Sequence, residues 1–113
     1  MNESSFNKDV VFTSEKVSVK VILETSFSKE IRILLKKGQE MKEHKAPYPI
    51  VIHVIEGEIN FGIEGNITHL SKGDIITLEA NISHNLIGLK DTVIRLTLSK
   101  NDSTDRLKTV INL

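Results

Sequence analysis

The sequence predicts an all-β fold, a sandwich or barrel formed by one domain. β-branched residues dominate, with 15 Ile, 9 Val and 8 Thr against only 2 Ala, and such side chains fit a pleated sheet but crowd a helix. Turn-forming residues recur roughly every 8–12 residues, which is typical of sandwiches and barrels. The length of 113 residues suits a single domain with one modest core.

Eight short apolar or alternating segments are expected to form strands. Residues 17–21 alternate with period two and predict a half-buried strand. Residues 30–36 fit either a strand or one helical face that Gly38 could cap, and the short, β-branched start favours the strand. Residues 50–55 are almost continuously apolar, which predicts a strand covered on both faces. The other expected strands are 58–63, 67–70, 75–78, 83–87 and 92–98.

The two ends of the chain are expected to be peripheral to a core at about 17–98. Residues 1–16 and 99–113 lack the regular alternation of the strands. The C-terminal stretch nevertheless carries four apolar residues that could form a short closing helix or strand, and the pattern does not decide between them: Leu107, Val110, Ile111 and Leu113.

Charge and cysteine content exclude several function classes. Lys plus Arg and Asp plus Glu both total 15, so the formal net charge is zero. A dedicated nucleic-acid binder or a polybasic membrane-surface protein normally carries a basic surplus. Cysteine is absent, which excludes disulfides, Cys-based zinc sites and thiol catalysis. No apolar run reaches membrane-spanning length, and the N-terminus is unlike a secretory signal, so a cytoplasmic protein is expected.

Glycine and histidine recur at characteristic spacings in two stretches. In the first, Gly38 is followed after five residues by His44, and the stretch closes at Gly57. In the second, Gly73 begins the segment Gly-Asp-Ile-Ile-Thr-Leu, and His84 follows six residues after its end. Together these stretches resemble the paired motifs of the cupin superfamily, in particular small single-domain bacterial cupins. The resemblance covers roughly residues 30–98 and implies a jelly-roll barrel or sandwich of about ten strands.

The chain departs from the metal-binding cupin pattern at several positions. In that pattern three histidines and one glutamate hold a metal ion, but here Ala46 and Ile50 occupy two of the four positions, in an H-x-A-P sequence. Only His44 and His84 keep a ligand, and two imidazoles leave most of the coordination to water. A weakly bound divalent metal is therefore the most that the resemblance implies. Other motif positions are also replaced, by Glu79, Asn81 and Gly88.

Two functions are compatible with this pattern. The favoured one is a non-enzymatic cupin that binds or senses a small molecule, with His44 and His84 as polar contacts in an apolar cavity. The alternative is a metal-dependent enzyme, of the oxygenase or isomerase type, that uses the same two histidines as residual ligands. No catalytic residue is identified. Tyr48, between two prolines, is a further candidate contact, although loop packing is favoured. The expected apolar lining is Ile50, Ile52, Val54, Ile76 and Leu86.

Other polar residues have less specific expected roles. Strand alternation predicts that His53 faces away from the barrel interior, and His69 precedes a turn, which predicts a surface position. Asp74 follows a turn glycine and is expected to accept hydrogen bonds from nearby backbone N–H groups. Arg95 could enter the barrel as an anion partner, but an exposed or interface position is slightly preferred.

The sequence also predicts a homodimer. Val51 and Ile55 lie on the face of segment 50–55 away from the interior, and such a patch needs a cover. The apolar residues at 10–12 could cross to a second subunit and pair with a sheet edge. The competing expectation is that the C-terminal tail of the same subunit covers this outer face.

Overall fold

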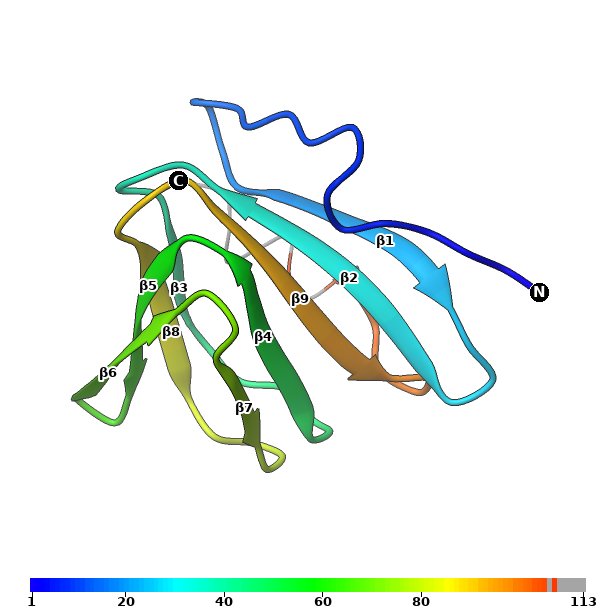
Figure 1. The fold of residues 1–113 in the computed structure, drawn as a ribbon. Coiled ribbons are helices and arrows are strands. Elements are labelled where there is room, and N and C mark those ends of the chain that lie inside the picture. Colours follow the sequence, from blue (N-terminus) through cyan, green and yellow to red (C-terminus); the bar gives the residue numbers. More distant parts are fainter. Residues whose placement is uncertain (106, 108–113) are drawn as a thin grey trace.

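The regular secondary structure of the described chain is almost entirely β-strand (Figure 1). The structure, a computed structural model, describes residues 1–105 and residue 107. Nine strands in this part of the chain form two antiparallel sheets, which confirms the predicted all-β jelly roll. The five-stranded sheet has the order β1 (Ser18–Glu24), β2 (Ser28–Leu35), β9 (Thr92–Ser99), β4 (Ile50–Glu56), β7 (Ile75–Leu78). The four-stranded sheet has the order β3 (Glu40–His44), β8 (His84–Gly88), β5 (Glu58–Ile63), β6 (Asn66–Ser71).

All eight expected strands form, and the ambiguous residues 30–36 belong to strand β2 rather than to a helix. The ninth strand, β3, was not expected, because Glu-Met-Lys-Glu-His contains a single apolar residue and shows no alternation of apolar and polar types. It forms because it pairs with β8. Tertiary pairing therefore overrides local sequence preference here.

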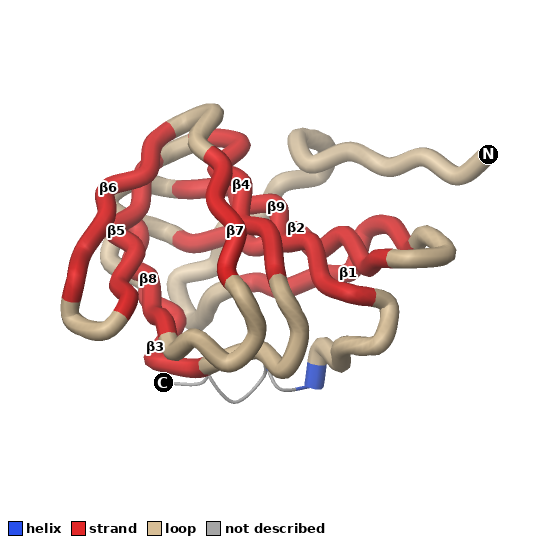
Figure 2. The backbone as a smooth tube through the Cα atoms, turned by 90° about the horizontal axis from the view of Figure 1, so that it is seen from below, coloured by secondary structure: helices blue, strands red, loops and turns tan. Residues whose placement is uncertain are grey.

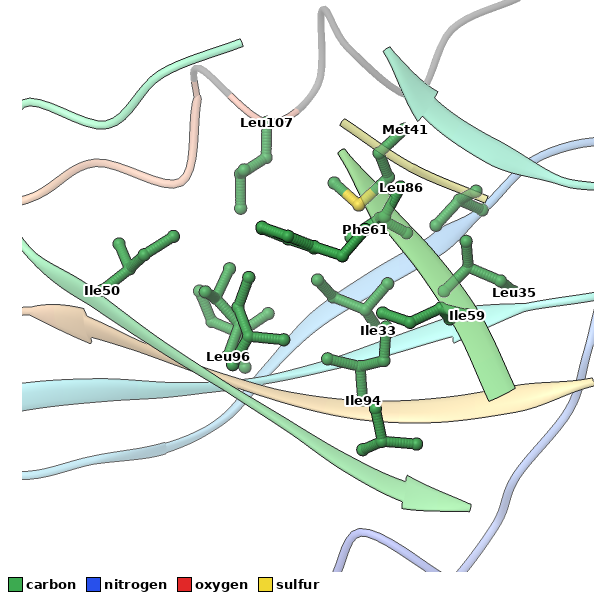
Figure 3. Packing of buried hydrophobic residues seen from close by; sticks show 14 of the residues in the cluster. Ile33, Leu35, Met41, Ile50, Ile59, Phe61, Leu86, Ile94, Leu96 and Leu107 are labelled. Atoms are coloured by element: carbon green, nitrogen blue, oxygen red, sulfur yellow. The ribbon is translucent and has the colours of Figure 1, made fainter. Parts of the chain in front are cut away.

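Figure 2 shows the backbone of the two sheets, and buried hydrophobic side chains from both sheets pack together in one core. Strand β4 illustrates how alternation in the sequence produces this core. Ile50, Ile52 and Val54 are buried in it, whereas the residues between them are only partly buried. His53 accordingly faces away from the interior, as predicted. Figure 3 shows the centre of the core, where Phe61 from β5 lies among aliphatic side chains of both sheets.

A glycine turn carries the chain from one sheet to the other between β4 and β5. Gly57 has φ +95°, a left-handed conformation that favours glycine. A Cβ atom at this position would lie 2.7 Å from the backbone oxygen of Asp91, so the close approach of the two chain segments also requires glycine.

A second turn fixes the end of β4. The Gly73 backbone N–H donates to the Val54 carbonyl at 2.8 Å, and the Val54 N–H donates to the Asp74 carbonyl at 2.9 Å. The Asp74 carboxylate accepts a hydrogen bond from the Ser71 backbone N–H at 2.8 Å, as the sequence predicted. The turn is thereby locked both internally and to the neighbouring strand.

The two terminal segments pack against opposite sides of the five-stranded sheet. Near the N-terminus, Arg32 donates to the carbonyl of Lys8, and the Phe6 ring lies 5.9 Å from the Arg95 guanidinium carbon. At the other end, Leu107 is helical and only 1% exposed, within the core. Leu107 thus does not cover the outer face, contrary to the competing expectation, and Val110, Ile111 and Leu113 lie outside the described residues. Residues 1–105 and 107 contain no helix suited to crossing a membrane.

Candidate functional site

Two histidines meet at one end of the four-stranded sheet. His44 on β3 and His84 on β8 are paired across the strands, and their ring centroids are 4.3 Å apart at an interplanar angle of 58°. His84 is buried, and His44 is partly exposed. Phe61 stacks on the His84 ring with a centroid separation of 5.4 Å. The β3–β8 pairing, which the sequence did not reveal, therefore brings the two predicted polar contacts together.

Backbone carbonyls fix the tautomer of each imidazole. The Nδ1 atom of His44 lies 2.6 Å from the Lys42 carbonyl oxygen, and that of His84 lies 2.9 Å from the Ile82 carbonyl oxygen. A carbonyl oxygen only accepts hydrogen bonds, so Nδ1 carries the proton in both rings. In its neutral form each ring then has its lone pair on Nε2, the atom that can accept a proton or bind a cation.

The cavity beside this pair is almost filled. Its volume is about 10 Å³, which is close to the space of a single water molecule. The expected apolar interior is thus a packed core rather than a hollow barrel. The lining residues are Ile33, Met41, His44, Ile50, Ile52, His84, Leu86, Ile94, Leu96 and Leu107.

Five of the eight sequence-predicted site residues lie on this cavity, and three do not. Tyr48 belongs to the loop between β3 and β4 and is 37% exposed. Val54 is fully buried in the core beyond the cavity lining, and Ile76 packs against the core only partly buried. Alternation along a strand places a side chain inside or outside the barrel but does not say how far along the barrel the cavity extends, which explains why Val54 and Ile76 lie beyond its lining.

The side chains near the histidine pair do not fit a cupin metal centre. Ala46 and Ile50 are each 3% exposed, and they fill two of the four ligand positions with apolar groups. Within residues 1–105 and 107, no three His, Asp or Glu side chains are grouped closely enough to hold a metal ion. Gly88, at another of the cupin motif positions, has little room for a side chain, because a Cβ there would lie 3.1 Å from the Lys36 carbonyl oxygen. Backbone packing therefore favours glycine at this motif position.

Basic side chains gather instead on the outer face of the five-stranded sheet. Lys20, Arg32, Arg95 and His53 are directly paired across β1, β2, β9 and β4, so they form one row on one face. Arg95 lies outside the barrel, in agreement with the preferred expectation. The row could not be recognised in the sequence, because it depends on the register of strands that are distant along the chain.

Glu30 neutralises one member of this row. It is 6% exposed, and its carboxylate accepts hydrogen bonds from Arg95 Nε at 2.9 Å, Thr97 Oγ1 at 2.5 Å and Ser28 Oγ at 2.7 Å. Burial raises the pKa of this carboxyl, but the hydrogen bonds from Thr97, Ser28 and Arg95, with the charge of Arg95, outweigh burial and hold the pKa below its ordinary value.

His69 lies apart from both groups. Its Nε2 atom is 3.1 Å from Glu58 Oε2, and its side chain is 54% exposed, so it occupies the surface position that the sequence predicted.

The family model of the cupin domain matches residues 31–99, which is more than half of the chain. The chain is a cupin. An RmlC-like cupin from Desulfovibrio desulfuricans superposes on this cupin with a TM-score of 0.78 at 20% identity, covering 88% of this chain and 96% of that one. A conserved double-stranded β-helix protein from Klebsiella pneumoniae also has a TM-score of 0.78, at 24% identity, covering 89% of this chain and 87% of that one.

A conserved protein of unknown function from Streptococcus pyogenes has a TM-score of 0.75 at 18% identity, and the match covers 90% of both chains. The search of curated proteins found no match. At these identities the likeness establishes the fold, and the activity has to be argued from the site of this cupin itself.

Proposed function

We propose that this cupin is a non-enzymatic protein that binds a small molecule at the His44–His84 pair. The observation that carries the proposal is the geometry of this pair, with ring centroids 4.3 Å apart and each Nδ1 proton directed to a backbone carbonyl. Fixed rings at the edge of an apolar interior suit recognition of a ligand with one polar end. A chain without cysteine is compatible with a cytoplasmic role, which we also propose.

The ligand class follows from the chemistry of the pair. Neutral imidazoles accept a hydrogen bond at Nε2, and protonated ones attract a carboxylate. The neighbouring walls are aliphatic, for example Ile52 and Leu96. A small organic acid with an apolar body meets both requirements, because its carboxyl group can contact the histidines while its body contacts the aliphatic walls.

Binding requires one lining side chain to leave its place, since the cavity of about 10 Å³ admits nothing larger than water. Among the lining residues of the described chain, Leu107 alone lies outside the strands. Figure 3 shows it entering the cluster from the C-terminal stretch. Moving Leu107 breaks no strand pairing, so we propose that the ligand takes its place.

NMR titration of the imidazoles with benzoate and with acetate tests the proposal. We expect benzoate to shift the His44 and His84 resonances together, with one affinity, and acetate to bind less because it lacks the apolar body. His69, which is exposed and does not line the cavity, serves as the internal control. Independent titrations of His44 and His84 that are unaffected by benzoate would overturn the proposal.

Leu107→Ala sharpens the test. The substitution enlarges the cavity, so we expect benzoate to bind the variant more tightly than the parent chain. Leu70→Ala, in the core but neither lining the cavity nor paired with a residue that lines it, is the matched control and should leave the affinity unchanged. Equal affinities for the parent chain and both variants would place the ligand elsewhere.

The metal-dependent enzyme is the second candidate, and the buried Ala46 and Ile50 side chains disfavour it. We expect elemental analysis of the purified protein to find far less than one equivalent of transition metal. One equivalent that disappears in the double variant His44→Ala/His84→Ala would instead favour the metal enzyme.

We further propose that the cupin acts as a homodimer through the outer face of β4 and β7. Val51 and Ile55 are only partly buried there, and Ile75 on the edge strand β7 is 62% exposed. A second copy of the chain would cover this apolar surface by a two-fold contact. We expect light scattering at micromolar concentration to give twice 12.7 kDa.

Val51→Lys should lower this mass, because a symmetric contact would bury two unpaired ammonium groups. Ile67→Lys, at a 71% exposed position on the four-stranded sheet, is the control and should not. A parent mass of 12.7 kDa would show that the dimer proposal is wrong.

A further inference from the structure

A pocket much larger than the cavity beside the histidines lies outside the barrel, between the N-terminal segment and the five-stranded sheet. Its volume is about 420 Å³, which is within the usual range for small-molecule sites. One wall is the N-terminal arm, which we define as residues 3–9, and the other is formed by residues of β1 and β2. Figure 1 shows the course of this arm beside β1. The lining residues are Glu3, Ser4, Ser5, Lys8, Asp9, Lys20, Val21, Ile22 and Arg32.

Arg32 is the central feature of this pocket. It is only 7% exposed, so its guanidinium is largely removed from water. Its Nη1 atom donates to the Lys8 carbonyl at 2.7 Å, its Nη2 atom donates to the Asp9 carbonyl at 3.4 Å, and its buried Nε atom has no acceptor. Backbone carbonyls supply partial charge but no full negative charge. A buried cation of this kind is unfavourable without an anionic partner.

The neighbours of Arg32 on the adjacent strands add further positive charge. Lys20 and Arg95 are directly opposite Arg32 on the two adjacent strands, and like charges in such pairs repel. Arg95 has Glu30 as its partner at 2.9 Å. Glu3 and Asp9 also line the pocket, yet Arg32 forms no ion pair with a carboxylate anywhere in residues 1–105 and 107.

We propose that this pocket binds a small molecule that carries a phosphate or carboxylate group. The anion compensates the buried charge of Arg32, and the exposed ammonium groups of Lys8 and Lys20 hold it from the arm and from β1. This site is separate from the histidine pair, which lies inside the barrel and is lined by none of the same residues.

The local backbone around the pocket is irregular on both walls. The β1–β2 pairing shifts register between Val21 and Leu23, and Ile22 at this bulge lines the pocket. On the opposite wall Asp9 has φ 55°, which is uncommon for a residue other than glycine. Bulges and strained residues are frequent beside binding sites. Lys8 and Asp9 belong to the arm and contact Arg32 of β2 through their carbonyls. An anion bound at Arg32 should therefore hold the arm against the sheet.

NMR titration with inorganic phosphate and with citrate, at constant ionic strength, tests the proposal. We expect shifts of the backbone amides of Lys20, Val21 and Arg32 that saturate, with little change at His44 and His84. The double variant Lys8→Ala/Lys20→Ala removes only exposed side chains and should bind roughly tenfold more weakly. Lys37→Ala, an exposed lysine that does not line the pocket, is the matched control and should bind as the parent chain does.

A saturating response to one probe alone identifies the preferred group, phosphate or carboxylate, and supports the proposal. Amide shifts that do not saturate, or that persist unchanged in the double variant, would overturn it. Arg32→Lys tests the central residue directly. An amide spectrum of this variant that is dispersed like that of the parent chain reports that the variant is folded. Since the amides of β1 and β2 report this site and the imidazoles report the barrel, failure here is distinguishable from failure of the proposed function.

Discussion

The interior of the barrel and the outer face of the five-stranded sheet differ in both packing and charge. The interior is apolar and leaves about 10 Å³ beside its two histidines. The outer face carries a row of basic side chains and a pocket of about 420 Å³. In this cupin, therefore, the barrel contributes most of the packing, while unsatisfied charge and open space lie outside it, under the N-terminal arm.

Each kind of substitution should therefore act through the dominant interactions of its own region. Substitutions inside should affect stability through lost packing, and substitutions outside should act through charge and pH.

Phe61→Ala should have the largest effect on stability. Phe61 is 1% exposed at the centre of the core, and truncation of such a residue costs about 3–5 kcal/mol of unfolding free energy. Phe27→Ala, at a position that is 75% exposed, is the matched control and should change stability little. Chemical denaturation measures both, and similar losses for the two variants would contradict the assignment of stability to the interior.

Glu30→Gln should have an intermediate effect on the outer face. The change removes the charge that Arg95 faces and disturbs the hydrogen bonds from Thr97 and Ser28. A loss of roughly 1–3 kcal/mol is expected. The exposed ion pair of Glu24 with Lys100 provides the control, since Glu24→Gln should cost much less. If Glu30→Gln is as stable as the parent chain, the carboxylate does not stabilise this face.

Glu30 should also make stability depend on pH. Its pKa in the folded protein is lowered, so the folded state binds a proton at this site less readily than the unfolded chain does. The stabilisation is therefore present above the ordinary glutamate pKa and is lost as pH falls through the lower folded value. Denaturant midpoints measured between neutral and acid pH should fall less steeply for Glu30→Gln than for the parent chain. Parallel curves would contradict this.

Phe6→Ala should have the smallest effect of the set. The ring lies 5.9 Å from the Arg95 guanidinium carbon, and a cation–π contact near the surface contributes about 0.5–1 kcal/mol. Phe6→Tyr keeps the aromatic face and should retain most of this. Hydrogen exchange of the amides in residues 3–9 is the more sensitive measurement, and it should be faster in Phe6→Ala if the ring helps to hold the arm.

The sequence predicted those parts of the fold that depend on local pattern. The alternation in residues 50–55 placed Ile50 and Ile52 inside and His53 outside, and the turn at Gly73 was assigned correctly. Strand β3 was missed because only Met41 in it is apolar. A strand whose formation depends on its neighbour leaves no periodicity of its own.

The candidate site could be predicted only in part. Motif spacing drew attention to His44 and His84, and the structure places their rings together. The near-filling of the cavity was not foreseen, because the sequence left open whether Leu107 belongs to a helix or a strand and did not place it in the core. The environment of Arg32 was likewise hidden, since it is created by register with Lys20 and Arg95 and by contacts 23 and 24 residues away along the chain.

The position of β9 has a consequence for the synthesis of this protein. Thr92–Ser99 is the last strand of the described chain, yet it lies in the middle of the five-stranded sheet, between β2 and β4. During translation the facing edges of β2 and β4 thus remain without their partner until this segment has left the ribosome, and unpaired edges are prone to association. A nascent chain that stalls before Thr92 would expose both edges to its neighbours on the same polysome.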